Sequence, residues 1–179
     1  MDVIPMDMEP LQTITGISQA DFLRGIGVDV VDLCEAEMEA QIKSGEMARL
    51  DCPVVHRFTP GLYVREISMP TGARLTSKTH GKEHPFVISK GEVSVWCDGA
   101  VSHYKAPYTG ITTPGSRRVL FVHSDTIWTT FHPTNSRDLD EIEKEIMEPH
   151  SNPLLETEYN KADGSLPDSC AALTEKGGE

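Results

Sequence analysis

The segment EVSVWCDGAVSHYK, Glu92–Lys105, contains the clearest strand–turn–strand pattern in the chain. Asp98-Gly99 separates two runs rich in β-branched and aromatic residues, which is typical of a two-residue hairpin turn. On either side of this hairpin, similar short runs alternate with turn signals at roughly 8–12-residue spacing, from Asp51 to Pro133. This pattern predicts a mainly β domain of the sandwich or barrel kind. The predicted strands are 62–69, 73–79, 85–89, 92–97, 101–105, 110–113, 118–123 and 126–132, with turns at 70–72, 90–91, 98–99, 114–115 and 124–125.

The segments that flank this block have helical or irregular patterns. Apolar residues at helical spacing predict an amphipathic helix from Val31 to about Arg49, and a possible capping box at 18–21 predicts a short helix before it. A second helix is expected over Asp138–Met147, capped by Ser136, with Leu139, Ile142, Ile146 and Met147 as its apolar stripe. We therefore expect an N-terminal arm with helices (1–50), a barrel (51–133), a helix (134–149) and an acidic flexible tail (150–179).

The charge of the chain is unevenly distributed. The 179 residues carry a formal charge of −12, but 1–50 contribute −7, 51–132 contribute +3 and 133–179 contribute −8. A strongly acidic chain argues against a general nucleic-acid binder. The basic middle block instead favours a small anionic ligand.

Other features narrow the class of protein. No run of 18 apolar residues and no signal-peptide pattern is present, so we expect no membrane span. Cys34, Cys52, Cys97 and Cys170 form no C-x-x-C pair. The sequence therefore predicts four reduced thiols in a cytoplasmic protein.

Two segments resemble the motifs of the cupin family. Pro70-Thr-Gly72 followed by KTHGKEHPFVISKG (78–91) is similar to the first motif, in which Gly, His-x-His, Glu and Gly follow at set spacing. When Gly91 is aligned with the closing glycine, His84 takes the place of the family's Glu. His80 then takes the place of the second His of the motif, and Lys78 takes the place of the first. Pro114-Gly-Ser-Arg-Arg118 resembles the second motif, with Arg117 or Arg118 in the place of its His.

This resemblance covers about residues 58–133 and fills one of the four metal-ligand positions in the family's way. It implies a cupin-type double-stranded β-helix, or jelly-roll barrel, of the small single-domain kind found in bacteria and phages. It also implies a homodimer or higher homo-oligomer, with residues 1–17 as an exchanged arm. The function does not follow, because one fold hosts many activities.

Strand alternation predicts which side chains face the inside of such a barrel. Lys78 and His80 share one face of their strand. If 118–122 and 126–130 form a hairpin, Arg118 and His132 share a face, so His80, His84 and His132 could converge. Three neutral imidazoles suit a divalent transition metal such as Fe, Mn, Ni, Zn or Cu. A register slip would replace His132 with His123.

The departures from the family motif indicate a different chemistry. Lys78 and Arg118, with Arg65 or Arg74, could hold a carboxylate or phosphate without a metal. Tyr63, Tyr104 and Tyr108 are candidate hydrogen-bond donors, and Glu66 is a candidate general base. Trp96 and Trp128 are expected to be packing residues.

Three functions therefore remain open. The first is a metal-dependent oxygenase, isomerase, lyase or hydrolase built on the three histidines. The second is a metal-free protein that binds or sequesters an anion such as a nucleotide or sugar acid through Lys78 and Arg118. The third is a structural or interaction protein that assembles through its barrel and arms.

Overall fold

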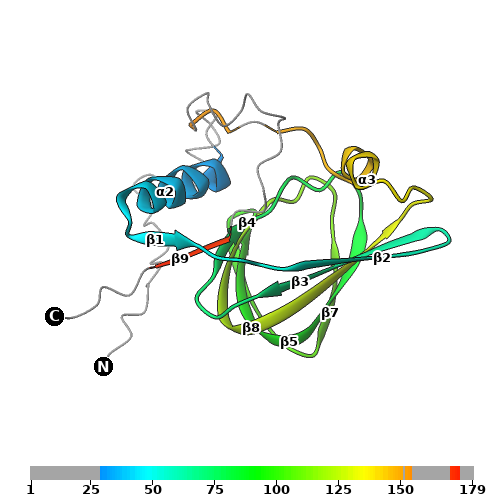
Figure 1. Ribbon diagram of the computed structural model, residues 1–179, viewed down its shortest axis with the longest axis horizontal. Coiled ribbons are helices and arrows are strands. Elements are labelled where there is room, and N and C mark those ends of the chain that lie inside the picture. The colour runs from blue at the N-terminus through cyan, green and yellow to red at the C-terminus, as the bar shows by residue number, and fades with distance from the viewer. Residues whose placement is uncertain (1–28, 151, 155–169, 174–179) are drawn as a thin grey trace.

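The computed structural model describes residues 29–150, 152–154 and 170–173. Its elements, in chain order, are α2 (Val30–Ser44), β1 (Met47–Arg49), β2 (Val54–Thr59), β3 (Leu62–Met69), β4 (Arg74–Thr76), β5 (His84–Cys97), β6 (Ala100–Lys105), β7 (Tyr108–Thr112), β8 (Arg118–Pro133), α3 (Leu139–Ile146) and β9 (Cys170–Leu173). The mainly β barrel expected from the sequence is confirmed: one antiparallel sheet curls strongly on itself (Figure 1).

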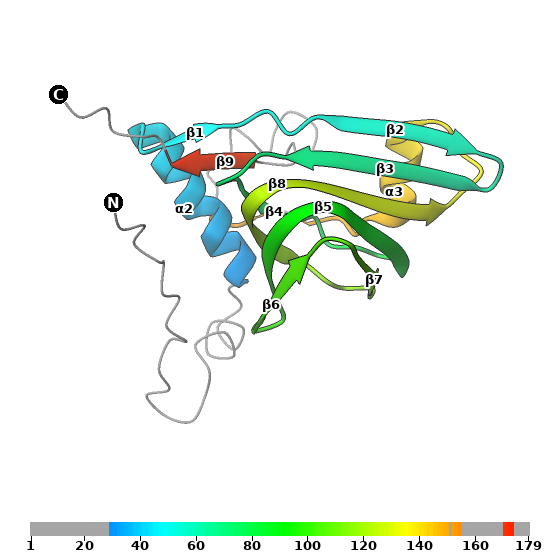
Figure 2. The same cartoon turned by 90° about the horizontal axis from the view of Figure 1, so that it is seen from below.

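Two long strands, β5 and β8, organise the sheet. They run antiparallel along most of their length, from Cys97 opposite Arg118 to Phe86 opposite Thr130. β3 pairs with the second half of β8, and β4 pairs with its first half. β6 and β7 extend the sheet on the other side of β5. Figure 2 shows the resulting curved sheet, with α3 near the far ends of β2 and β3 and α2 beside β1 and β9.

The strand prediction was wrong where it broke these long strands. The expected turn at Lys90-Gly91 lies inside β5, where the pairing with β8 shifts register while the strand continues. The expected hairpin at 123–125 does not exist, because β8 continues without interruption from Arg118 to Pro133. In a strongly curled sheet, a long strand bends at a bulge or a glycine, and the local sequence there looks like a turn.

The predicted hairpin and the observed continuous strand give the same inward-facing set. Successive residues of one strand alternate between its faces, so the even-numbered residues of β8 share a side. Leu120, Val122, Trp128 and His132 are accordingly buried. Leu120, Val122 and Trp128 contribute to a core with residues from β3, β4 and β5. Its buried members are Ile67, Met69, Ala73, Leu75, Phe86, Ile88, Val93, Val95, Leu120, Val122 and Trp128.

The helices also differ from the sequence prediction in their bounds. α2 ends at Ser44, and Gly45 adopts a left-handed conformation at φ 79° that closes the helix. Residues 47–49 then form β1, which the sequence analysis had assigned to the helix. α3 is capped by Asp138, whose side chain accepts from the amides of residues 140 and 141, and not by Ser136.

The flanking segments are tied to the barrel at two further points. β9, inside the segment expected to be a flexible tail, pairs with both β1 and β4. Cys52 is disulfide-bonded, while Cys34 and Cys97 are free thiols. The expectation of four reduced thiols was therefore wrong, because cysteine spacing does not show which cysteines the fold brings together. The expected helix at 18–21 and the arm at 1–17 lie outside the described residues.

Neither described helix, in residues 29–150, 152–154 or 170–173, has the length and apolar character needed to cross a bilayer.

Candidate functional site

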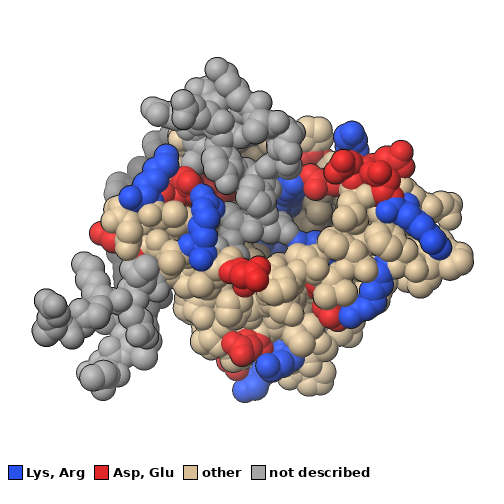
Figure 3. Space-filling model, viewed as in Figure 1, with Lys and Arg blue, Asp and Glu red and all other residues tan. Residues whose placement is uncertain are grey.

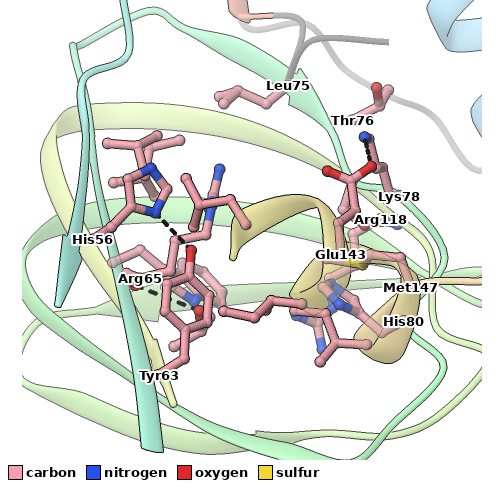
Figure 4. A pocket seen from close by; sticks show the side chains of 18 of the residues that line it. His56, Tyr63, Arg65, Leu75, Thr76, Lys78, His80, Arg118, Glu143 and Met147 are labelled. Atoms are coloured by element: carbon pink, nitrogen blue, oxygen red, sulfur yellow. Dashed lines mark hydrogen bonds and ion pairs between the residues drawn. The ribbon is translucent and has the colours of Figure 1, made fainter. Parts of the chain in front are cut away.

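A cavity of about 400 Å³ lies inside the barrel and beneath α3 (Figure 4). Its apolar wall comes from the core residues of β3, β4 and β8, among them Ile67, Leu75 and Trp128. The apolar stripe of α3 that the sequence predicts forms the opposite wall. The residues of this stripe that line the cavity are Leu139, Ile142, Ile146 and Met147. The stripe therefore lies over the cavity as well as against the barrel.

Three cationic side chains that the sequence analysis names as candidates line this cavity. Arg65 lies on β3, Arg118 begins β8, and Lys78 lies in the loop after β4. Among the described lining residues, the only acidic side chain is that of Glu143 on α3, whose Oε1 lies 2.5 Å from Nζ of Lys78. Figure 3 shows basic atoms in a hollow beside the acidic residues that gather over α3. The cavity therefore carries an excess of positive charge.

Arg118 is held in a defined orientation. Its Nη2 donates to Oγ1 of Thr112, which is fully buried, at 3.0 Å, and its guanidinium lies 5.7 Å from the centre of the Phe86 ring. Its backbone amide donates to Oγ of Ser77. Contacts to a planar aromatic face and to a buried hydroxyl restrict the rotamers of an arginine. Less conformational entropy is then lost when it binds an anion.

The neighbouring Arg117 has a different role. It lies just before β8 and does not line the cavity; it is 7% exposed and contacts Asp29 at 3.1 Å, Asp32 at 2.5 Å and Glu35 at 2.9 Å. These carboxylates belong to α2 and its cap. Of the two arginines that the resemblance left open, Arg118 therefore faces the cavity, and Arg117 joins α2 to the barrel.

The histidine side chains predicted to converge do meet. The ring centres of His80 and His84 are 4.7 Å apart, and those of His84 and His132 are 4.3 Å apart. All three side chains are buried, but only His80 lines the cavity directly. His80 lies in the loop after β4, where it forms an isolated bridge with Met147, and not on the predicted strand 73–79.

Burial and neighbouring charge keep these imidazoles neutral. Burial, followed by His84 and Arg118, lowers the pKa of His80 to about 3. Burial, followed by His84 and Arg65, lowers the pKa of His132 to about 3. Burial also lowers the pKa of His84, against the effect of its hydrogen bond to the Lys82 carbonyl. The two arginines that charge the cavity therefore also act on the histidines.

The fit of these histidines to a metal ion is only partial. Nδ1 of His84 lies 3.1 Å from the Lys82 carbonyl and must donate to it, which leaves Nε2 as a buried lone pair. Nε2 of His84 and Nδ1 of His80 have no hydrogen-bond partner, as expected of metal ligands. Nε2 of His132, however, bonds to Oγ1 of Thr130 at 3.0 Å. Among the described residues, no three His, Cys, Asp or Glu side chains are placed to hold one metal ion.

Tyr63 connects the histidines to the other wall of the cavity. It is buried, its ring stacks on His132, and its hydroxyl lies 2.7 Å from Nδ1 of His56. Burial, together with the charge of Arg65, lowers the pKa of His56, which favours its neutral form. Burial raises the pKa of Tyr63, which keeps the phenol protonated.

Several other candidates do not reach the cavity. Glu66 contacts Arg57 and Thr129, and Tyr104 and Tyr108 pack on Phe86 away from the lining. The guanidinium of Arg74 lies over Phe121, 6.0 Å from the ring centre. His123, the alternative ligand, lies on the exposed face. Trp128 packs in the core as predicted and also borders the cavity, whereas Trp96 is half-buried outside that core.

Sequence reasoning missed two residues of this site. His56 was not considered, although its even spacing from Val54 on the same strand would have placed both on one face. Glu143 was not among the candidate residues either. Glu143 directly follows Ile142 of the apolar stripe. This position could have indicated that Glu143 lies at the edge of the surface that the stripe packs against.

Comparison with known proteins supports nothing beyond the fold. No family model matches the chain, and no curated protein sequence matches it. Among solved structures, it is similar to the cupin domain of Schizosaccharomyces pombe Cnp3, with 17% identity, 54% of this chain and 68% of that one covered, and a TM-score of 0.41. It is also similar to an uncharacterised Klebsiella pneumoniae protein with a double-stranded β-helix domain, with 21% identity, 52% and 82% covered, and a TM-score of 0.41.

A third such structure is an RmlC-like cupin from Methanocaldococcus jannaschii, with 14% identity, 50% and 86% covered, and a TM-score of 0.41. At these values the similarity carries no information about ligand or activity. The strand order of this chain, with one antiparallel sheet curled around the cavity and α3 beside it, is that of a mainly β barrel.

Proposed function

We propose that the protein binds a small anionic molecule, one that bears a carboxylate or phosphate, inside the barrel and without a metal ion. The observation that carries the proposal is the placement of Arg65, Lys78 and Arg118 around one cavity whose only acidic described lining residue is Glu143. Guanidinium groups pair with carboxylates and phosphates through two parallel hydrogen bonds. The neutral histidines and the hydroxyl-bearing side chains of the lining add donors and acceptors that carry no charge.

The size of the cavity limits the ligand. A volume of about 400 Å³ is near the lower end of the range for small-molecule sites, which suits a sugar acid or a single nucleotide better than a polymer. Its wall is mostly apolar, apart from the cations and hydroxyls. We therefore expect a ligand with one anionic end and a less polar body that contacts Trp128 and the stripe of α3.

Thermal unfolding tests this function directly. The purified full-length protein is heated with inorganic phosphate, citrate, nucleoside monophosphates and hexuronic acids, and with the neutral sugars as controls. A ligand at a hundred times its dissociation constant stabilises the folded state by about 2.7 kcal/mol. For a chain of this size, that corresponds to a rise in Tm of about 5–10 °C.

The matched variants are Arg118→Gln and Arg137→Gln. Both remove one positive charge, but Arg137 is exposed and does not line the cavity. Loss of a charge-assisted hydrogen bond is worth about 1.5–3 kcal/mol, so Arg118→Gln should weaken binding by about 10–100-fold, while Arg137→Gln changes it little. Stabilisation by neutral sugars alone, or equal loss in the two variants, would contradict the proposal.

A second candidate function, a metal-dependent enzyme centred on His80, His84 and His132, is favoured by one observation. Nδ1 of His80 and Nε2 of His84 are buried without a hydrogen-bond partner. Metal analysis of the purified protein separates the two functions. Near-stoichiometric Fe, Mn, Ni or Zn that disappears in both His80→Gln and His84→Gln supports the enzyme, while metal content unaffected by these changes excludes this ligand set.

A further inference from the structure

A second group of histidines lies on the exposed face of the sheet, outside the barrel cavity. Ser94 is on β5, and His103 is directly opposite it on the neighbouring strand β6. On the other side of β5, Phe121 of β8 is opposite Ser94, so His123, two residues along, lies on the same face. Two strands that flank β5 therefore bring one imidazole each to either side of Ser94. Figure 2 shows β6, β5 and β8 side by side.

The two rings point their nitrogens at the same oxygen. Oγ of Ser94 lies 3.1 Å from Nδ1 of His103 and 2.7 Å from Nε2 of His123, and the ring centres are 5.1 Å apart. The side chain of His103 is 50% exposed. Neither imidazole takes part in the cavity, since neither lines it. The cluster is thus accessible from solvent and separate from the site described above.

The far nitrogen of His103 is anchored by a carboxylate. Nε2 of His103 lies 2.7 Å from Oε1 of Glu92, while Lys105 contacts the other oxygen of Glu92 at 3.3 Å. A carboxylate only accepts, so Nε2 of His103 carries a proton and donates to Glu92, which leaves Nδ1, on the side of Ser94, as the nitrogen that can bind an ion. A carboxylate behind a histidine in this way orients metal-binding imidazoles and raises their basicity.

We propose that His103 and His123 form a surface site for a divalent transition-metal ion, with the Ser94 hydroxyl and water as the remaining ligands. Metal–imidazole bonds are about 2.0–2.1 Å long, shorter than the present distances of 3.1 and 2.7 Å from the two ring nitrogens to Oγ of Ser94, so both exposed rings must rotate toward a shared ion.

The ligand set indicates the order of affinity. Two imidazoles with oxygen ligands favour Cu²⁺ over Ni²⁺ and Zn²⁺, and exclude tight binding of Mg²⁺ or Ca²⁺, which prefer carboxylates and carbonyls. Since the site has two strong protein ligands rather than four, it is open to exchange and leaves coordination positions free for water. The ion would lie on the outer side of the sheet, with the wall of the barrel between it and the cavity.

Isothermal titration of the full-length protein with CuCl₂, NiCl₂, ZnCl₂ and MgCl₂ at pH 7.5, after treatment with a chelator, tests the site. We expect one Cu²⁺ per chain, weaker Ni²⁺ and Zn²⁺, and no measurable Mg²⁺ binding. His103→Gln and His123→Gln should each weaken Zn²⁺ binding by at least tenfold, and Glu92→Gln by about tenfold through the orientation of His103. All three positions are on the sheet surface, so circular dichroism should show an unchanged fold.

His80→Gln and His84→Gln serve as controls because they change only the cavity histidines. Titrations of these two variants that match the wild type support the surface site. The proposal is overturned if the wild type binds none of the transition metals, if His103→Gln and His123→Gln bind as the wild type does, or if binding is lost in the cavity variants instead. Loss of metal binding in His80→Gln and His84→Gln would support the metal-enzyme candidate. The anion-binding assay with Arg118→Gln tests the proposed function independently of this result.

Discussion

Nζ of Lys78 and Oε1 of Glu143 lie 2.5 Å apart, although 65 positions separate the two residues in the chain. The pair connects the loop after β4 with α3 at the cavity, and Figure 4 shows it beside Arg118. In this pair, Glu143, the one acidic side chain among the described lining residues, offsets the charge of Lys78, one of the three cavity cations. Because the pair is partly exposed, it is worth only about 0–1 kcal/mol of stability. Its main effect is on the charge that a ligand meets.

Glu143→Gln should therefore strengthen anion binding. Removing this carboxylate releases Lys78 and removes a repulsive charge, which together are worth about 1 kcal/mol at a partly exposed site, or a few-fold in affinity. Calorimetry with citrate or inorganic phosphate, whichever stabilises the wild type, measures the change. Glu141→Gln removes the same charge from the same helix outside the lining and should leave the affinity unchanged. Weaker binding by Glu143→Gln would show that the carboxylate itself contacts the ligand.

Arg117 and Arg118 should respond differently to the same substitution. Arg117→Met leaves Asp32 and Glu35 buried without their cation, and breaking a buried ion pair in this way costs about 3–5 kcal/mol. Arg118→Met removes a cavity side chain whose contact is a hydroxyl and should cost much less. Urea unfolding curves of both variants measure the difference. Equal destabilisation would mean that Arg118 also holds the fold together.

Acid should destabilise the protein partly through its buried histidines. The pKa of His132 is about 3 in the folded state, below its ordinary value near 6.5, so the unfolded chain binds more protons between these two pH values. The free energy of unfolding therefore falls as the pH drops below 6.5, by up to about 1.4 kcal/mol per pH unit for this group.

The comparison of wild type with His132→Gln isolates this effect, because acidic residues titrate in both proteins. Between pH 6.5 and 5, the wild type should lose more stability than the variant in denaturant titrations. Parallel loss in the two proteins would show that His132 is protonated in the folded state.

Gly91, the closing glycine of the first motif, should tolerate no side chain. Its φ is +93°, and an added Cβ would lie 2.3 Å from Oγ1 of Thr126 and 2.5 Å from the carbonyl oxygen of Asp125. Gly99 has a similar φ of +85°, but nothing lies within 4 Å of its Cβ position. Gly99→Ala should therefore cost about 1–2 kcal/mol from backbone strain alone. Gly91→Ala should cost more, because β8 must also move away from β5.

Differential scanning calorimetry of the two alanine variants gives this comparison. A Tm for Gly91→Ala equal to that of Gly99→Ala would show that the β5–β8 pairing relaxes around the added methyl group. A lower Tm for Gly91→Ala would explain why a glycine occurs in the middle of a long strand, where it ordinarily weakens the sheet.

Much of the site followed from alternation along the strands. His132 and Arg118 share the inner face whether 118–132 is a hairpin, as predicted, or one strand, as observed, because both arrangements keep the same parity. The burial of His84 and His132, on β5 and β8, agrees with that reasoning, whereas His80 is buried in the loop after β4. The apolar stripe of α3 was equally clear from its spacing. These features depend on the spacing of apolar and polar residues along one strand or one helix, which can be read directly from the sequence.

The sequence by itself determined most strands of the basic barrel block, the apolar stripe of α3 and which side chains share a face of a strand, but it did not reveal β1, β2 or β9. Only the tertiary structure decided that β5 and β8 continue through apparent turns, that Arg117 pairs with α2 while Arg118 faces the cavity, and that Glu143 meets Lys78. The reason is physical: periodicity is a property of neighbouring residues, whereas strand register and ion pairing depend on contacts between segments far apart in the chain, set by how the whole sheet curls.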